Sequence, residues 1–369
     1  MASIAPAPTL GPVRQTYASA QTFPPMARAY THVSQVIKET GLLARTPWFY
    51  ALVGAALVLA FGGVVAGFIL LGDSWFQLLM AAALGVIMTQ VAFLGHEAAH
   101  KQILTGGRAN TRLARVLAAG VVGMSLSWWD AKHSRHHANP NRVGKDPDIE
   151  VDTISFLEED AAASRGFIRV LTRKQGYLFF PLLMLEGVNL HYLGLKHLLT
   201  TPGKVEGRAL EIVLILTRLA IVIVPVFLLL PLGMAFAFMG VQLAVFGVYM
   251  GAAFAPNHKG MPIIAPDARL DFFSKQVRTS RNVSGGWWAT WLMGGLNYQV
   301  EHHLFPSMSR IHLSRAREIV RDQCETLGVP YTETSLVRSY AIVIEYLNRV
   351  GLAARDPFDC PMVGEYRRA

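Results

Sequence analysis

The sequence predicts an all-α integral membrane protein in which four transmembrane helices form two hairpins beneath a cytosolic helical cap. Composition is the first indication, because hydrophobic residues make up 52% of the 369 residues and charged residues only 16%. Soluble proteins average about 25% charged residues. The mean hydropathy of +0.33 points the same way. The other two indications are four long apolar runs and a basic polar stretch between the second and third of them.

Each of the four apolar runs is long enough to cross a bilayer, which takes about 20 residues. They cover about residues 48–71, 75–95, 212–232 and 233–254. Gly72-Asp73-Ser74 joins the first two runs and Pro231-Leu232-Gly233 joins the last two, so each pair is expected to form a hairpin. Arg218 lies inside the third run, and its long side chain is expected to reach the interface if that span starts late.

The remaining residues are assigned to a lead, a cap and a tail. Residues 1–30 are rich in Ala, Pro, Thr and Gln and lack the apolar centre of a secretory signal, so we expect a disordered lead. The membrane domain is expected over residues 31–330, with a cytosolic cap formed by residues 101–208 and 257–330. Residues 331–369 are expected to form a C-terminal cytosolic tail.

Shorter helical patterns occur outside the four runs. Residues 31–45 predict either an interfacial helix leading into the membrane or an ordinary surface helix. Residues 116–129 are apolar but too short to span, so they are expected to be re-entrant or to lie along the interface. Residues 176–199 mix polar and apolar side chains, which favours an amphipathic interfacial helix. Residues 309–327 predict a surface helix.

The net charge of +9 indicates an anionic partner. Nucleic acid is one interpretation of a basic chain, but the apolar spans favour a membrane surface or an anionic lipid or cofactor instead. The two short hairpin turns hold one acid and no base, whereas residues 101–208 are rich in Lys and Arg. The positive-inside tendency therefore predicts that this stretch and both termini face the cytoplasm. Two cysteines, Cys324 and Cys360, are too few for a disulfide framework or a cysteine-ligated cluster.

Three short stretches hold seven of the 12 histidines. They are His96-Glu-Ala-Ala-His100, His133-Ser-Arg-His136-His137 and Gln299-Val-Glu-His302-His303. Residues three and four apart share one helix face, so each stretch directs its imidazoles the same way. The predicted topology puts all three stretches on the cytoplasmic side. Together they offer more imidazoles than one ion takes, which predicts a two-iron site at the membrane surface.

Two further residues are candidates for the same site. His258 follows the last apolar run and is as plausible an extra ligand as a plain surface residue. Gln299 stands where the third stretch would otherwise begin with His. It offers either a weak carbonyl ligand to iron or a hydrogen bond to a ligating His or an iron-bound water, and the sequence leaves both open. Weaker candidates are His191, His197 and His312.

Other chemistries fit parts of the pattern. The HExxH motif is the signature of zinc metalloproteases, with Glu97 as general base, and at a helix end it would indicate an intramembrane protease. That interpretation leaves the other two histidine stretches unused. Asp146 and Asp148 follow the second stretch. They are second-shell partners of ligating histidines or turn residues, and the turn is the favoured interpretation.

The motifs H-E-A-A-H, H-S-R-H-H and Q-V-E-H-H-L-F-P resemble the three histidine boxes of membrane fatty acid desaturases. The resemblance covers roughly residue 48 to the helix after Pro306. The leading Gln of the third box resembles the front-end and linoleoyl-type branch. The resemblance implies a non-haem di-iron centre with an additional ligand from outside the boxes, for which His258 is the candidate. The implied box ligands are His96, His100, His133, His136, His137, His302 and His303.

The resemblance also implies a reaction and its partners. The expected reaction is O2-dependent introduction of a C=C double bond into a long-chain acyl-CoA or acyl-lipid, and a hydroxylase could use the same boxes. Many front-end relatives carry a fused cytochrome b5 domain with a His-Pro-Gly-Gly motif, which this sequence lacks. Electrons are therefore expected from a separate protein, such as a ferredoxin-type or flavin reductase or a cytochrome b5.

Overall fold

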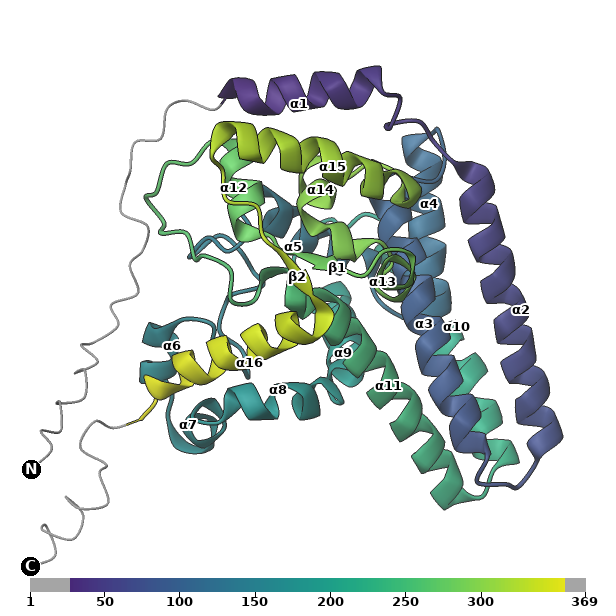
Figure 1. Ribbon diagram of the computed structural model, residues 1–369. Helices are drawn as coiled ribbons and strands as arrows, with labels where there is room; N and C mark the ends of the chain where they lie inside the picture. The colour runs from purple at the N-terminus through teal and green to yellow at the C-terminus, as the bar shows by residue number, and fades with distance from the viewer. Residues whose placement is uncertain (1–26, 356–369) are drawn as a thin grey trace, which may run out of the picture.

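The computed structural model describes residues 27–355, which are almost entirely helical apart from one small sheet (Figure 1). In this sheet β1 (Asn282–Ser284) pairs in parallel with β2 (Glu333–Ser335). Residues 1–26 of the predicted lead and residues 356–369 of the predicted tail lie outside the described residues.

Four long apolar helices confirm the four predicted spans. They are α2 (Pro47–Leu71), α3 (Gln77–Ala99), α10 (Arg208–Leu229) and α11 (Leu232–His258). Most of α3 is buried, chiefly against α11 and α2, whereas α2 leaves almost its whole apolar surface exposed. Such exposure is unfavourable in water and suits the hydrocarbon core of a bilayer, where a helix satisfies its own backbone hydrogen bonds.

The predicted re-entrant or interfacial segment is a helix that packs against two of the spans. It comprises α4 (Gly107–Arg115) followed by a π-helix, η1 (Val116–Val122), which contacts α3 and α10. Arg218 of α10 is buried here, and its Nε donates a hydrogen bond to the Val121 carbonyl at 3.2 Å. The expectation that Arg218 extends to the interface is therefore wrong, because its guanidinium is used inside the protein.

The helices from α5 to α9 lie between the two pairs of spans in the sequence. Their bounds are α5 (Leu126–Ala138), α6 (Glu158–Ala163), α7 (Gly166–Thr172), α8 (Gln175–Leu183) and α9 (Glu186–Thr200). The single amphipathic helix predicted over residues 176–199 is thus two helices, α8 and α9, which meet at an angle of 73°. The inner side of this bend faces α11.

The last part of the chain returns over the ends of α3 and α11. Its helices are α12 (Phe272–Thr279), α13 (Trp287–Leu292), η2 (Leu296–Tyr298), α14 (Gln299–Leu304), α15 (Arg310–Leu327) and α16 (Leu336–Leu352). Near the start of the described chain, α1 (Ala27–Glu39) lies along α15, with Val33 and Ile37 fully buried (Figure 1). Within the predicted tail, α16 packs against α8 and α11.

Candidate metal centre

The first histidine stretch lies where α3 ends. His96 occupies the last turn of the helix, and His100 follows it directly as the C-cap residue. The two rings meet with centroids 4.6 Å apart, as expected for residues four apart on one helix face. His96 is buried between neighbouring helices, so its ring has a fixed position.

The second stretch forms the last turns of α5. This helix starts at Ser125, whose hydroxyl accepts a hydrogen bond from the backbone N–H of Trp128 and so caps the helix. At the other end the Nε2 atoms of His133 and His137 are 3.0 Å apart. Trp129 stacks on the His133 ring with centroids 4.2 Å apart, which holds that imidazole in place.

The third stretch is α14, and two glycines allow it to approach α3. Gly294 and Gly295 have φ angles of +59° and +84°, which disfavour other residues. A Cβ at Gly294 would lie 2.4 Å from the ring of Phe93 on α3. The absence of side chains here therefore lets the backbone turn closely against α3 before α14 begins.

Glu301 anchors α14 although it lies between box histidines. Its carboxylate accepts hydrogen bonds from the Tyr331 hydroxyl at 2.8 Å and from Asn282 Nδ2 at 2.7 Å. The Asn282 side chain also accepts the backbone N–H of Val300 at 2.9 Å, which ties α14 to β1. Burial raises the pKa of Glu301 to about 7. This carboxyl therefore has a structural partner set of its own and does not face the histidines.

Five imidazoles from all three stretches form the first group. They are His96, His100, His133, His137 and His302, and one ring nitrogen of each lies within 4.8 Å of all the others. The His133 Nε2 atom is 3.2 Å from that of His96 and 3.0 Å from that of His100. Helices far apart in the sequence thus direct nitrogen atoms to one point.

A second group consists of His136, His258 and His303, all buried. The Nε2 atoms of His136 and His258 are 3.3 Å apart. The side-chain amide of Gln299 lies 2.9 Å from His258 Nε2, and Asn257 donates a hydrogen bond to Gln299 Oε1 at 3.1 Å. His258 lies inside the last turn of α11. All eight histidines singled out by the sequence therefore meet, and Gln299 adjoins the second group.

Asp146 supports the second group directly. Both of its carboxylate oxygens lie 3.0 Å from His136 Nδ1. The same carboxylate accepts the backbone N–H groups of Asn141 at 2.6 Å and Asp148 at 2.9 Å, so it also forms the predicted turn. Burial lowers the pKa of His136, but the carboxylates of Asp148 and Asp146 outweigh it and raise the pKa overall. The turn interpretation of Asp146 was therefore incomplete, because one side chain does both.

The other two imidazoles of the second group have partners at Nδ1 as well. His258 Nδ1 lies 2.9 Å from the Thr279 carbonyl, and His303 Nδ1 lies 2.8 Å from Gln276 Oε1. The Gln276 amide also donates to the His137 carbonyl at 2.8 Å. Hydrogen bonds of this kind fix the tautomer and leave Nε2 free to bind a metal ion.

The electrostatics of both groups fit metal ions. Burial lowers the pKa of His133, His137, His302 and His303 well below the usual value. These rings are therefore neutral, which is the form that binds metals. The Nε2 atoms of His302 and His303 are buried without any hydrogen-bond partner among the described residues. Buried polar atoms normally have partners, so a cation within each group accounts for them.

Glu97 is not available as the general base of a metalloprotease. Arg310 Nε and NH2 donate to its two carboxylate oxygens at 2.7 and 2.6 Å. The Tyr50 hydroxyl lies 3.5 Å from the same carboxylate, and all three side chains are buried. The HExxH motif is therefore a helix anchor in this protein.

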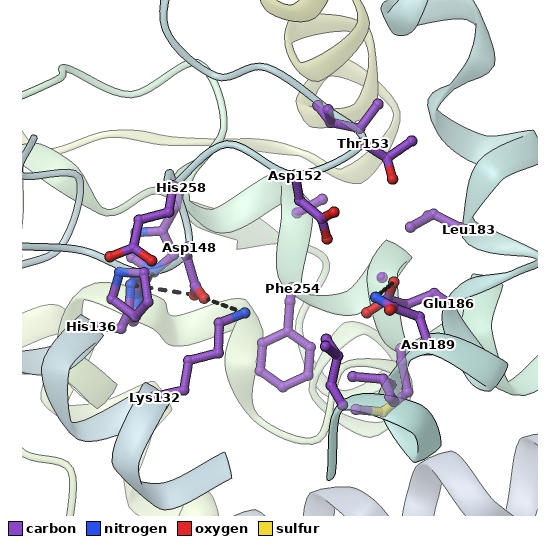
Figure 2. Close-up of a pocket in the computed structure, with 18 of the residues that line it drawn as sticks. Lys132, His136, Asp148, Asp152, Thr153, Leu183, Glu186, Asn189, Phe254 and His258 are labelled. Atoms are coloured by element: carbon purple, nitrogen blue, oxygen red, sulfur yellow. Dashed lines mark hydrogen bonds and ion pairs between the residues drawn. The ribbon is translucent and has the colours of Figure 1, made fainter. Parts of the chain in front are cut away.

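A cavity of about 520 Å³ opens beside the second group. Its polar lining includes Lys132, His136 and Asp148 on one side (Figure 2). Glu186 and Asn189 lie on the opposite side (Figure 2). Apolar side chains from α8, α9 and α11 complete its walls, and they include Phe179, Leu182, Leu183, Leu190, Leu193, Met250 and Phe254.

Known proteins share this arrangement of motifs. The model of the family described as "Fatty acid desaturase" matches residues 73–335. The chain belongs to this family. Among its relatives are a Delta(8)-fatty-acid desaturase of Helianthus annuus and the Delta(6)-fatty-acid desaturase fat-3 of Caenorhabditis elegans. The first is 28% identical and covers 90% of this chain and 75% of the relative, and the second is 24% identical and covers 88% and 75%.

A third relative is an acyl-lipid (8-3)-desaturase of Rebecca salina, 30% identical over 74% of this chain and 64% of the relative. With its four apolar helices, the desaturase described here is a membrane fatty acyl desaturase and hence an oxidoreductase. The protease and hydroxylase alternatives find no support in these matches.

Several residues of the site were not identified from the desaturase sequence. Gln276, Asn282 and Arg310 carry no motif and lie far along the chain from their partners. Their polar side chains are common surface types, and only the folded chain brings them beside the histidines. The single available signal was Glu97, since a buried carboxylate at a membrane helix end requires a cationic partner.

Proposed function

We propose that this desaturase holds two iron ions, one in each histidine group, and introduces a C=C double bond into a long-chain acyl group. The acyl chain gives up two hydrogens and two electrons, and two further electrons and two protons reduce O2 to two waters. Bound iron supplies the oxidant that an unactivated C–H bond requires. The observation that carries the proposal is the meeting of eight imidazoles in two adjacent groups within a chain of the desaturase family.

The proposed ligands follow from the two groups. His96, His100, His133, His137 and His302 would hold one iron, and His136, His258 and His303 the other. The ring stacking of His137 on His303, with centroids 4.2 Å apart, keeps the two groups adjacent. Gln299 would complete the second group as a weak ligand or as a partner of a bound water, because its amide lies beside His258 Nε2.

The cavity beside the second group is the proposed binding site for the acyl chain. Its apolar walls suit a hydrocarbon, and His133 and His136 form part of its lining. An acyl chain in this cavity would therefore present one region of its length to the proposed iron centre. Depth in the cavity would then determine the position of the double bond, since the position of a reacting atom to within about an ångström affects rate strongly.

The charge of the cavity favours a lipid-linked acyl group over acyl-CoA. Lys132 is paired with Asp148 at 3.0 Å, and the Lys259 ammonium donates to the Asp148 carbonyl at 2.6 Å. Both cations of the lining are thus engaged, whereas Glu150, Asp152 and Glu186 add further carboxylates. The phosphates of coenzyme A would meet net negative charge there. Relatives named acyl-lipid desaturases are consistent with this choice.

The proposed orientation places the cap, the iron centre and both termini in the cytoplasm. The Lys- and Arg-rich stretch between the two pairs of spans supports it, as does the lack of basic residues in the two hairpin turns. In this arrangement α2 with α3 and α10 with α11 form two hairpins. Residues 31–330 form the membrane domain, and electrons come from a separate reductase-linked donor such as a ferredoxin or a cytochrome b5.

The fatty acid profile of an expressing host tests the proposal. Cells gaining the chain should accumulate acyl groups with a new double bond, and His136→Ala should abolish them. His32→Ala is the matched control, since this exposed histidine bonds only Gln323 on the cap surface and should leave the product unchanged. Hydroxylated products, or no new products from wild-type chain supplied with electrons, would contradict it.

A further inference from the structure

Four cations gather on one face of the cap, here called the basic face: Arg142, Lys145, Arg269 and Lys275. Arg142 donates hydrogen bonds to the carbonyls of Pro266 and Ala268, which joins the loop after α5 to the loop before α12. Lys145 and Arg269 are exposed, and the other two are half-buried. The nearest acids in the sequence are Asp267, which is exposed, and Asp271, whose carboxylate caps α12.

The cations of the basic face lack carboxylate partners. Among the described residues, the ion pairs of the protein lie elsewhere, and Lys275 donates instead to the Ala138 carbonyl at 2.5 Å. Burial lowers the pKa of Lys275, and the charges of Arg142 and Lys145 lower it further. The like charges are therefore close enough to repel each other. An uncompensated cluster of this kind complements an acidic partner and raises its rate of encounter.

The basic face lies directly over the second histidine group. Lys275 is adjacent in α12 to Gln276, whose side chain contacts His303 Nδ1 at 2.8 Å and the His137 carbonyl at 2.8 Å. Lys275 itself bonds the carbonyl of Ala138, the residue after His137. One side chain and one hydrogen bond thus separate the surface from an imidazole of the metal centre. Rapid electron transfer needs a short separation of this kind.

We propose that the basic face docks a small acidic electron-carrier protein, an inference that rests on the proposed function. Desaturation needs two electrons from outside, so two reduced one-electron carriers must bind and leave in each turnover. Exposed charge pairs suit this exchange because they speed association more than they slow release. Lys145 and Arg269 make the contact, and Gln276 links the docking face to His303.

Binding measurements test the inference without reference to activity. Protein in nanodiscs, both iron-loaded and metal-free, is titrated at low ionic strength with a plant-type ferredoxin and, separately, with a soluble cytochrome b5 domain. The expected result is that the double variant Lys145→Glu and Arg269→Glu binds at least one of these carriers about tenfold more weakly or worse. The matched control is Lys204→Glu with Arg108→Glu, which reverses two exposed cations elsewhere and should change Kd less than about twofold.

Further arms separate the alternatives. Carbodiimide cross-linking should join Lys145 to carboxylates of the carrier. Equal carrier binding by the two double variants, or a loss that occurs only for vesicles with anionic lipid, would overturn the inference. With dithionite and a mediator as electron source, the Lys145→Glu and Arg269→Glu protein should match wild-type turnover. A wild-type enzyme inactive even with dithionite would refute the proposed function, while the Kd values would still decide the docking face.

Discussion

Arg310 and Glu97 form a bidentate ion pair in which both side chains are at least 96% buried, with N–O distances of 2.6 and 2.7 Å. The pair connects the end of α3, which carries His96 and His100, to the start of α15, which follows the third box. It therefore holds the first and third histidine stretches in register. It also explains why an HExxH motif can occur here without a protease function.

Removing one partner of this pair should be costly. Arg310→Met leaves the Glu97 carboxylate buried and unpaired, so we expect a loss of about 3–5 kcal/mol in the free energy of unfolding. The double variant with Glu97→Gln should recover part of that loss, because no charge then remains buried. Thermal unfolding of the purified variants in detergent measures both. Equal melting temperatures for wild type and Arg310→Met would refute the structural role of the pair.

Asp146→Asn should weaken iron binding without unfolding the protein. The carboxylate holds His136 through Nδ1, and loss of such partners lowers metal affinity about 10–100-fold. Iron retained during titration with a chelator is the measurement. Asp152→Asn serves as control, since Asp152 lines the same cavity without a hydrogen bond to a histidine. Equal iron retention by both variants would show that Asp146 is only a turn residue.

Leu190→Trp should block the acyl cavity. The larger side chain would occupy part of the space of about 520 Å³ next to the second histidine group. We expect turnover of long acyl chains to fall about tenfold or more, because the reacting carbons are displaced, while iron content stays unchanged. Leu199→Trp is the control on the same helix, where the side chain is 69% exposed. Unchanged products from Leu190→Trp would place the acyl chain elsewhere.

Tyr340→Phe should loosen the end of α11. Pro256 has no N–H to donate to the Ala252 carbonyl one turn earlier, and the Tyr340 hydroxyl donates to that carbonyl at 3.0 Å instead. Loss of this bond should cost about 1–3 kcal/mol. The melting temperature should fall relative to Tyr192→Phe, whose ring is 57% exposed. Identical melting temperatures would mean that the freed carbonyl needs no partner.

The same proline shows where prediction from the sequence stopped. The fourth span was expected to end at residue 254, because Pro256 normally terminates a helix. In the structure α11 continues to His258, because Tyr340 from α16 replaces the missing backbone donor. No local pattern reveals a hydroxyl that arrives from 84 residues farther along the chain. The spans themselves were predictable, since their hydropathy is a local property.

The candidate site divides in the same way. His133, His136 and His137 are close in sequence, so their shared helix face could be predicted from spacing alone. That His258 joins His136 and His303 could be only one of two open interpretations, because it depends on how α11 and α14 pack. Gln276 could not be predicted at all. It carries no motif, and its contacts with His303 and His137 exist only once α12 folds over the second box.

The metal content of the purified protein tests the central claim most directly. Two histidine groups, each fitted to one ion, predict about two iron ions per chain, measured by elemental analysis after purification under conditions that preserve bound metal. One zinc ion per chain, or a single iron ion at saturation, would contradict the two-iron centre proposed for this desaturase.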